Sequence, residues 1–281
     1  MKFIIRQTFP LLIVFLTGVF LISCSPDRKL AGNFAKSKLQ RSVLLLQPKF
    51  VYKVSLKTHV PDSLNIKDKS LYDSVLMAHS NILRYINDSM FIANYMVGLN
   101  KELRKFHFTI YTAEQTAKFM ETDTAAYIVN VAQLEVDENI FPYRDETQVD
   151  DSYYYHDHKL NSITVDSWFE ISEVNDNKKD NRVYYASDEI TDNLQGEFTQ
   201  DIFTGEIKYF YTIDSLKPGD VYNFAYQLGR SYAGYTFDVL MNKFVKDHLA
   251  SGEKEKKYWR FDPRAQKLFE ATTDKFIPLK K

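Results

Sequence analysis

The spacing of apolar residues predicts alternating strands and helices between residues 42 and 120. Ser42 to Leu56 is apolar and β-prone, and Pro48 interrupts it, which favours an edge or bent strand. After Ser89, a residue type that caps helices, large apolar residues recur at every fourth position, as in an amphipathic helix: Phe91, Tyr95, Leu99 and Leu103. A short strand is expected at His107–Tyr111, and a short helix at Ala113–Met120.

The clearest strand signal lies at Ala125 to Val136, where apolar residues occupy both sets of alternating positions. Alternation assigns Tyr127, Val129 and Val131 to one face. It assigns the remaining apolar residues to the other face: Ala126, Ile128, Ala132, Leu134 and Val136. Two apolar faces are typical of a central strand that is covered on both sides.

The second half of the chain predicts antiparallel strands and one long helix. Phe141 to Asn161 is polar, acidic and tyrosine-rich, and we interpret it as a long excursion. The expected strands are Ile163–Ser172, Arg182–Ser187 and Ile207–Ile213, and a closing hairpin is expected between Tyr258 and Phe269. Pro218 begins a helix that reaches His248. Small residues at four-residue steps in this helix predict close approach of another backbone, within the chain rather than from a partner: Ala225, Gly229 and Ala233.

The first 23 residues have the layout of an export signal. Lys2 and Arg6 form a short positive region, and an apolar run extends from Phe9 to Ile22. These 14 residues are fewer than the roughly 20 that a helix needs to cross a bilayer. We therefore predict a cleaved signal peptide over residues 1–23.

Residues Leu21-Ile22-Ser23-Cys24 resemble the lipobox of bacterial lipoproteins, in which an aliphatic residue, a tolerant position and a small residue precede a cysteine. The resemblance implies that Cys24 carries a diacylglyceryl group and, after cleavage, an N-acyl chain. Two acyl chains already hold a protein stably on a membrane. Ser25 stands where an aspartate retains familiar lipoproteins at the inner membrane. We therefore expect attachment to the outer membrane on its periplasmic face, with the cell surface and the inner membrane as alternatives.

Residues 24–42 are expected to form a basic tether after the lipidated cysteine. Asp27 is the single acid in this segment, and the basic residues are Arg28, Lys29, Lys36, Lys38 and Arg41. One hypothesis places these cations against anionic lipid headgroups. The alternatives are a solvated linker or a short helix that uses Leu30, Phe34 and Leu39.

Composition limits the class of function. The 281 residues include 36 Lys and Arg against 37 Asp and Glu, a net charge of −1, and loss of Lys2 and Arg6 with the signal peptide lowers it by two, to −3. No strong positive field remains to attract nucleic acid. Tyrosine (19) and phenylalanine (21) are abundant, so large aromatic rings must find partners in the core or on a contact surface. Cys24 is the single cysteine, which leaves no thiol for chemistry in the body.

His156 and His158 are the candidate metal ligands. Two imidazoles that flank Asp157 would share one face of an extended segment. Zinc sites need three or four convergent ligands, and this pair supplies two. The alternative is a contact or solvated loop, together with the neighbouring tyrosines 153–155. No catalytic or cofactor-binding residue is predicted.

Two other patterns point to chemistry less specifically. Gly229-Arg230-Ser231-Tyr232-Ala233 is similar to a nucleophile elbow, but the helical stripe continues through Ser231, whereas an elbow needs a strained turn. Glu135, Asp137 and Glu138 could suggest acid–base catalysis. Their position after a strand favours its solvated end instead.

These patterns predict an α/β fold: one domain over residues 43–281 with a mixed sheet, a long C-terminal helix and a lipid-anchored N-terminal tether. The lipobox and element order resemble small envelope lipoproteins such as the auxiliary lipoproteins of ABC-type lipid transport systems. The resemblance implies a non-enzymatic accessory, assembly or transport-auxiliary subunit with an envelope protein partner. The alternative is an anchored periplasmic hydrolase or metal-dependent enzyme that uses the His156/His158 region. A third hypothesis, binding of an extended lipid or peptide, requires an apolar groove between sheet and helix.

Overall fold

A computed structural model describes residues 25–37, 40–57, 59–122, 124–174, 182–250, 257–272 and 275–279. The chain divides into two compact units. We call Gln40–Ala233 with Lys275–Lys281 the sheet unit, and Met1–Leu39 with Gly234–Asp274 the small unit. The predicted signal peptide and Cys24 lie outside the described residues. Among the helices that are described, none is long and apolar enough to cross a membrane.

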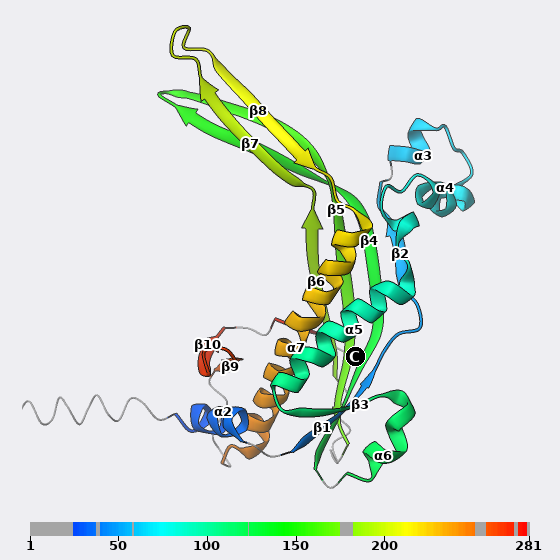
Figure 1. Ribbon diagram of the computed structural model, residues 1–281, viewed down its shortest axis with the longest axis vertical. Helices are drawn as coiled ribbons and strands as arrows, with labels where there is room; N and C mark the ends of the chain where they lie inside the picture. Colours follow the sequence, from blue (N-terminus) through cyan, green and yellow to red (C-terminus); the bar gives the residue numbers. More distant parts are fainter. Residues whose placement is uncertain are drawn as a thin grey trace, which may run out of the picture. The chain divides into compact units, whose positions relative to one another are not determined.

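The sheet unit is built on a mixed β-sheet with the strand order β11-β6-β5-β4-β1-β3 (Figure 1). Strand β4 pairs in parallel with β1 and, further along, with β2, and β1 also pairs in parallel with β3. The pairs β4–β5, β5–β6 and β6–β11 are antiparallel. The strands are β1 (Arg41–Leu46), β2 (Tyr52–Ser55), β3 (Phe108–Tyr111), β4 (Ala125–Val149), β5 (Ser152–Glu173), β6 (Arg182–Thr191) and β11 (Ile277–Leu279). The predicted mixed α/β class is confirmed.

The helices of the sheet unit are α3 (His59–Ser63), α4 (Tyr72–Ala78), α5 (Asp88–Lys105), α6 (Thr116–Met120) and the first half of α7 (Pro218–His248), with 3₁₀ turns at Lys69–Leu71, Leu83–Tyr85 and Ala113–Gln115. Of these, α5 and α7 lie over one face of the sheet (Figure 1). The stripe predicted for α5 is confirmed, because Phe91, Tyr95, Leu99 and Leu103 are all fully buried. The predicted cap at Ser89 is wrong. Asn87 caps the helix, and its side chain accepts a hydrogen bond from the N–H of Met90.

Helices α5 and α7 approach each other through a pair of facing glycines. A Cβ atom on Gly229 would overlap the carbonyl oxygen of Tyr95, and one on Gly98 would overlap that of Tyr226. Each helix therefore packs against the other's backbone at a distance that a side chain at these positions would not allow. The small-residue ridge of α7 packs within the chain, as predicted.

A β-bulge corrects the predicted faces of β4. The pairing register with β5 shifts between Val131 and Gln133, which leaves Ala132 as an extra, exposed residue. One extra residue reverses the alternation, so burial moves from odd to even positions. Val129 and Val131 consequently share the helix-covered face with the residues that alternation had placed opposite: Leu134 and Val136. Near its start β4 is covered on both sides, because Ala126 packs with Leu44 and with Phe119 of α6.

Two strand predictions differ from the structure. The predicted interruption at Pro48 is confirmed, because Ser42–Leu56 forms two strands on either side of it, but β1 lies inside the sheet between β3 and β4 and is not an edge strand. The segment Phe141–Asn161 is not an irregular excursion, because β4 and β5 stay paired as far as Val149 and Ser152. The sequence pattern did not predict this hairpin, because its polar and aromatic residues alternate without an apolar face. The rings that pack on it come from a distant segment, residues 207–214.

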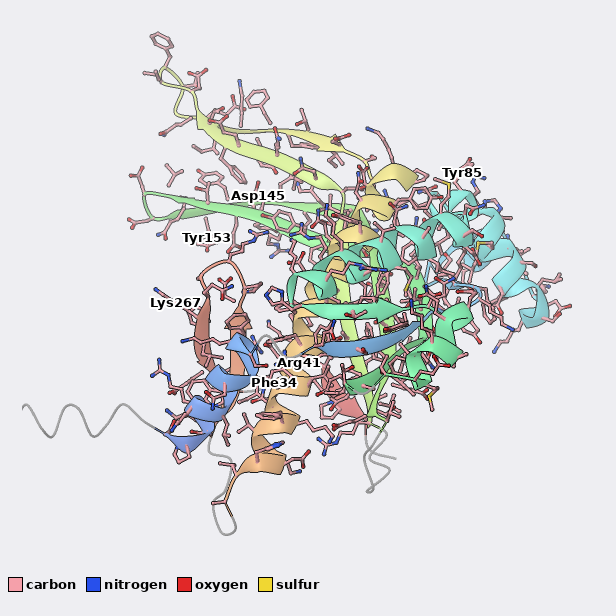
Figure 2. All side chains as sticks on the ribbon, turned by 60° about the horizontal axis from the view of Figure 1, so that its bottom comes forward. Phe34, Arg41, Tyr85, Asp145, Tyr153 and Lys267 are labelled. Atoms are coloured by element: carbon pink, nitrogen blue, oxygen red, sulfur yellow. The ribbon has the colours of Figure 1, made fainter. Side chains whose placement is uncertain are left out.

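The small unit has a core of its own. It contains α2 (Pro26–Lys36), the second half of α7, and a hairpin of β9 (Tyr258–Asp262) and β10 (Lys267–Ala271), which confirms the predicted closing hairpin. The Phe34 ring, labelled in Figure 2, lies 5.5 and 5.2 Å from the rings of Phe237 and Phe244. The side chain of Asn242 hydrogen-bonds both the N–H and the carbonyl of Trp259. These contacts explain why part of the predicted tether is a helix, and why the body separates into two units where one domain was expected.

Candidate functional site

The sheet unit carries an extended arm of two stacked hairpins. One is the distal part of the β4–β5 hairpin, residues 141–160. The other consists of β7 (Asn193–Gln200) and β8 (Ile207–Asp214), which pair only with each other among the described strands. Figure 1 shows the β7–β8 hairpin lying along the end of the β4–β5 hairpin. We call these two segments the arm. The sequence predicted β8 but not β7.

The two candidate metal ligands lie together inside the arm. His156 and His158 occupy one face of β5, as predicted, and their ring centroids are 4.6 Å apart. His156 stacks on Tyr209 of β8 at 4.7 Å and 21°. His158 meets the ring of Tyr211 edge-on at 4.8 Å and 71°. The imidazoles therefore act as packing groups that join the two hairpins.

A chain of hydrogen bonds runs through the same rings. The Tyr209 hydroxyl donates to Asp145 Oδ2 at 2.8 Å, and its oxygen lies 2.9 Å from His158 Nε2. Burial, with the hydrogen bond to Asp145, raises the pKa of Tyr209 to about 12, so the phenol stays protonated at neutral pH. Since the Tyr209 proton goes to Asp145, His158 Nε2 donates to the Tyr209 oxygen. The hydrogen bonds between these side chains require a glycine at position 196, because a Cβ atom there would overlap both Tyr209 and Asp145.

This arrangement gives the metal hypothesis two imidazoles, those of His156 and His158. The Nε2 atom of His158 is occupied by Tyr209. Across the part of the chain that the structure describes, no three His, Cys, Asp or Glu side chains gather in a way that could hold a metal ion.

The outer face of the arm presents tyrosines and a charged pair. Arg144 makes a two-pronged contact with Asp157, at 2.7 and 2.9 Å, and its guanidinium lies 4.3 Å from the centroid of the Tyr155 ring. Tyr153 and Tyr155 are 63% and 58% exposed. Large rings with one polar end are the residues that protein interfaces favour.

The most exposed apolar residues of the described chain stand at the tip of the β7–β8 hairpin. Ile202 is 93% exposed and Phe203 98%. The turn that carries them is ordered by hydrogen bonds: the Asp201 carboxylate accepts from the N–H groups of Phe203 and Thr204, both at 2.9 Å. Gly205 supplies the left-handed backbone (φ 73°) and donates to the Asp201 carbonyl. An ordered turn thus holds two large apolar side chains in water. The sequence indicates a turn at Phe203-Thr204-Gly205, which the structure confirms, but it does not reveal that the two apolar side chains stay exposed.

The arm is acidic. It contains nine acidic residues against three basic ones, and the basic residues are Arg144, Lys159 and Lys208. Its field repels anionic surfaces and attracts cationic ones.

The remaining candidate residues are separated by the fold. Ser231 lies inside α7 and is exposed, so it is not on the strained turn of a nucleophile elbow. Glu138 faces the covered side of the sheet and is fully buried, so its predicted solvated position is wrong. Glu135 and Asp137 point to the opposite face, where Asp166 lies on the neighbouring strand.

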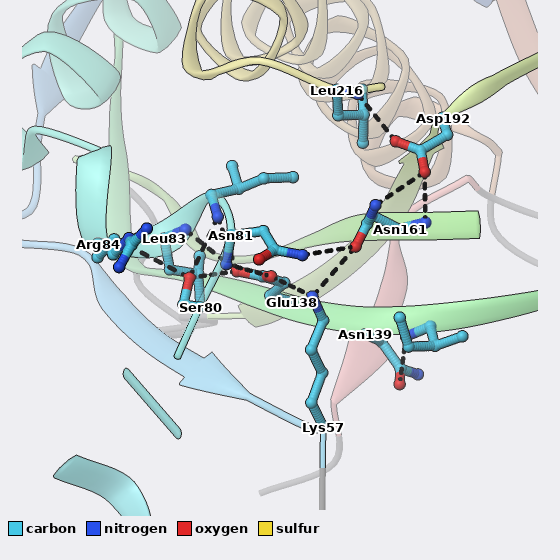
Figure 3. Close-up of polar contacts among 12 residues, drawn as sticks. Lys57, Ser80, Asn81, Leu83, Arg84, Glu138, Asn139, Asn161, Asp192 and Leu216 are labelled. Carbon is cyan, nitrogen blue, oxygen red and sulfur yellow. Dashed lines mark hydrogen bonds and ion pairs between the residues drawn. The ribbon is translucent and has the colours of Figure 1, made fainter. Parts of the chain in front are cut away.

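Glu138 is the centre of a buried polar network that the sequence did not reveal (Figure 3). Its carboxylate accepts from Lys57 Nζ at 2.5 Å, from the Ser80 hydroxyl, and from three backbone N–H groups at 2.9 to 3.2 Å, those of Asn81, Ile82 and Leu83. Burial alone would raise the pKa of Glu138, but these hydrogen bonds outweigh it and lower the pKa. The network is structural, because one carboxylate of β4 holds two distant segments, one at Lys57 and the other at residues 80–83.

Asp137 lies on the sheet face opposite Glu138, near the carboxylates of Glu135 and Asp166, and its pKa leads to a testable prediction. Burial, and then the negative charges of Glu135 and Asp166, raise its pKa from 3.8 to about 6. A raised carboxyl pKa favours the folded state when the group is protonated, so this contribution is full below about pH 4 and is lost as the pH rises through about 6. We expect Asp137→Asn to increase the free energy of unfolding by about 1–2 kcal/mol at pH 8 and by little at pH 4. Urea unfolding at the two pH values measures this, and an equal effect at both would contradict it.

No protein-family model matches the chain, and no curated protein is significantly similar to it.

Proposed function

We propose that this protein is a lipid-anchored envelope lipoprotein that works as a non-enzymatic accessory or assembly subunit by docking its arm on a protein partner. The observation that carries the proposal is the tip, where Ile202 and Phe203 stand almost fully exposed on a hydrogen-bonded turn. Exposing two adjacent large apolar side chains is unfavourable in water by roughly 1.5–3 kcal/mol each relative to burial. Such a pair is suited to fill a pocket on another molecule.

The apolar tip and the acidic charge of the arm indicate what kind of protein surface would bind it. An apolar pocket would accept Ile202 and Phe203, and cationic side chains around it would complement the nine acids of the arm. The same acidic charge disfavours insertion of the tip among anionic lipid headgroups. The proposed anchor at Cys24 would keep the arm in the same compartment as its partner.

The test uses a photoactivatable phenylalanine analogue at position 203 in the full chain, expressed in its native host. We expect irradiation of intact envelopes to join residue 203 to one protein, and the second substitution Ile202→Ser to reduce the yield at least about tenfold, since a central apolar anchor contributes about 2 kcal/mol or more. The matched control is Phe269→Ser, which removes an aromatic ring that is 50% exposed outside the arm, and it should leave the yield unchanged.

Two results would contradict the proposal. Cross-links to lipid alone would make the tip a membrane contact, and equal yields for the Ile202→Ser and Phe269→Ser chains would remove the tip from any interface. The anchor is tested separately by mass spectrometry of the mature N-terminus, where an unmodified thiol at Cys24 would exclude lipid attachment.

A further inference from the structure

The small unit contains a groove between helix α2 and the β9–β10 hairpin. Its volume is about 580 Å³. Four basic side chains line it: Arg28, Lys29 and Lys36 from α2, and Lys267 from the first position of β10. Figure 2 labels Lys267 on this hairpin. Two segments more than 200 residues apart in sequence therefore direct cations to the same groove.

The groove has no acidic residue among its described lining residues. Asp27, the acid of α2, is 3% exposed, and its carboxylate accepts a hydrogen bond from the N–H of Arg28 instead. The side-chain amide of Asn33 adds a hydrogen-bond donor to the lining, whereas the Gln266 amide nitrogen, also at the groove, donates to the Pro263 carbonyl at 2.7 Å. Cations and amide donors around an unneutralised groove are the chemistry that recognises a phosphate group.

The lining is also partly apolar. Phe261 and Leu268 contribute ring and aliphatic surface, and Gly32 and Ala35 on α2 leave space beside them. Inorganic phosphate would leave this apolar surface unused. A phosphodiester that carries a glycerol backbone and the first part of its acyl chains would contact both kinds of surface.

The position of the groove in the chain agrees with that ligand. Ser25, which directly follows the predicted lipidation site Cys24, is itself a lining residue. A groove that begins at the residue next to an acylated cysteine would lie at the level of the lipid headgroups.

We propose that this groove binds the headgroup phosphate of an anionic phospholipid, with Arg28, Lys29, Lys36 and Lys267 as its cationic contacts. The site goes beyond the proposed function, because it needs neither the arm nor a protein partner. It also extends the basic-tether hypothesis, since Lys267 belongs to a segment that the sequence did not connect with the amino end.

The experiment uses a chain that begins at Ser25 and so keeps every described residue but has no lipid anchor of its own. Its binding is measured by co-sedimentation with vesicles of phosphatidylcholine alone, and with vesicles of equal parts phosphatidylcholine and phosphatidylglycerol. We expect binding to the anionic vesicles only. Neutralising one juxtamembrane cation weakens binding about 5-fold, so the Lys29→Gln/Lys267→Gln double variant should bind about 25-fold more weakly.

A matched control separates the groove from general charge. Lys118→Gln removes an exposed lysine of α6 in the sheet unit, and it should change binding less than about 2-fold. Circular dichroism confirms that each variant is folded, which is expected because Lys29 and Lys267 are both exposed.

Three results would overturn the proposal. They are equal binding to neutral and anionic vesicles, equal effects of Lys29→Gln and Lys118→Gln, and full competition by millimolar inorganic phosphate at constant ionic strength. The last would make the groove a site for free phosphate. Since none of these measurements involves Ile202 or Phe203, failure of the groove and failure of the arm are distinguishable.

Discussion

A Gly229→Val substitution is expected to abolish folding of the sheet unit. A Cβ at this position would overlap the carbonyl oxygen of Tyr95 and crowd the N–H of Leu99, and both are backbone atoms inside α5 that cannot rotate away. To accommodate valine the helices would have to separate, which would open the packing of Tyr95 and Leu99, both fully buried. We expect a cost of about 4–5 kcal/mol or more, comparable with the whole stability of many domains.

The same helix offers a matched control for this prediction. Gly234 is five residues further along α7, and nothing lies within 4 Å of a Cβ built there. Gly234→Ala should therefore stabilise the protein by about 0.5–1 kcal/mol, because alanine favours the helix more than glycine does. Urea unfolding followed by circular dichroism measures both variants. Similar behaviour of the two would show that the α5–α7 approach is looser than described.

Glu138→Leu is expected to destabilise the protein by about 3–5 kcal/mol, because it leaves the charge of Lys57 buried without its partner. Lys57 is 5% exposed and Glu138 0%, so neither is solvated by water. The substitution also removes the acceptor for the N–H groups of Asn81, Ile82 and Leu83. Unsatisfied donors of this kind cost about 1–3 kcal/mol each when they stay buried.

The reciprocal change should cost less. In Lys57→Met the Glu138 carboxylate keeps its donors from Ser80 and the backbone, so we expect a loss of about 1–3 kcal/mol. The double variant should be more stable than Glu138→Leu alone, since no charge is then left buried. Equilibrium unfolding of the three variants forms a double-mutant cycle. A zero coupling energy would mean that the pair does not interact in solution.

The α5 stripe and the long helix were predictable because each depends on local periodicity. Phe91 to Leu103 repeats at the helical period, and Pro218 and His248 are the observed limits of α7. The strand faces of β4 were not predictable in the same way. The bulge at Ala132 adds one residue to the strand, and nothing in the residue types around it indicates that the alternation reverses there.

The candidate site was only half predictable. His156 and His158 share a face because any extended strand places alternate residues together. Tyr209, Tyr211 and Asp145 complete the cluster from positions that are sequence-distant, and their approach depends on the stacking of the β7–β8 hairpin. The metal hypothesis came from the two histidines alone, whereas the structure gives them aromatic and phenolic neighbours.

By itself the sequence determined the α/β class, the long helix from Pro218, the small-residue ridge around Gly229 and the expectation of a lipid anchor at Cys24, because each is encoded in contiguous residues. Only the tertiary structure decided that Glu138 lies against Lys57, that Ile202 and Phe203 stand at the tip of an arm, and that Lys267 joins the cations of α2. These relations join residues separated by tens to hundreds of positions. Local periodicity carries no information about which distant segments meet, since that choice depends on the packing of the whole unit.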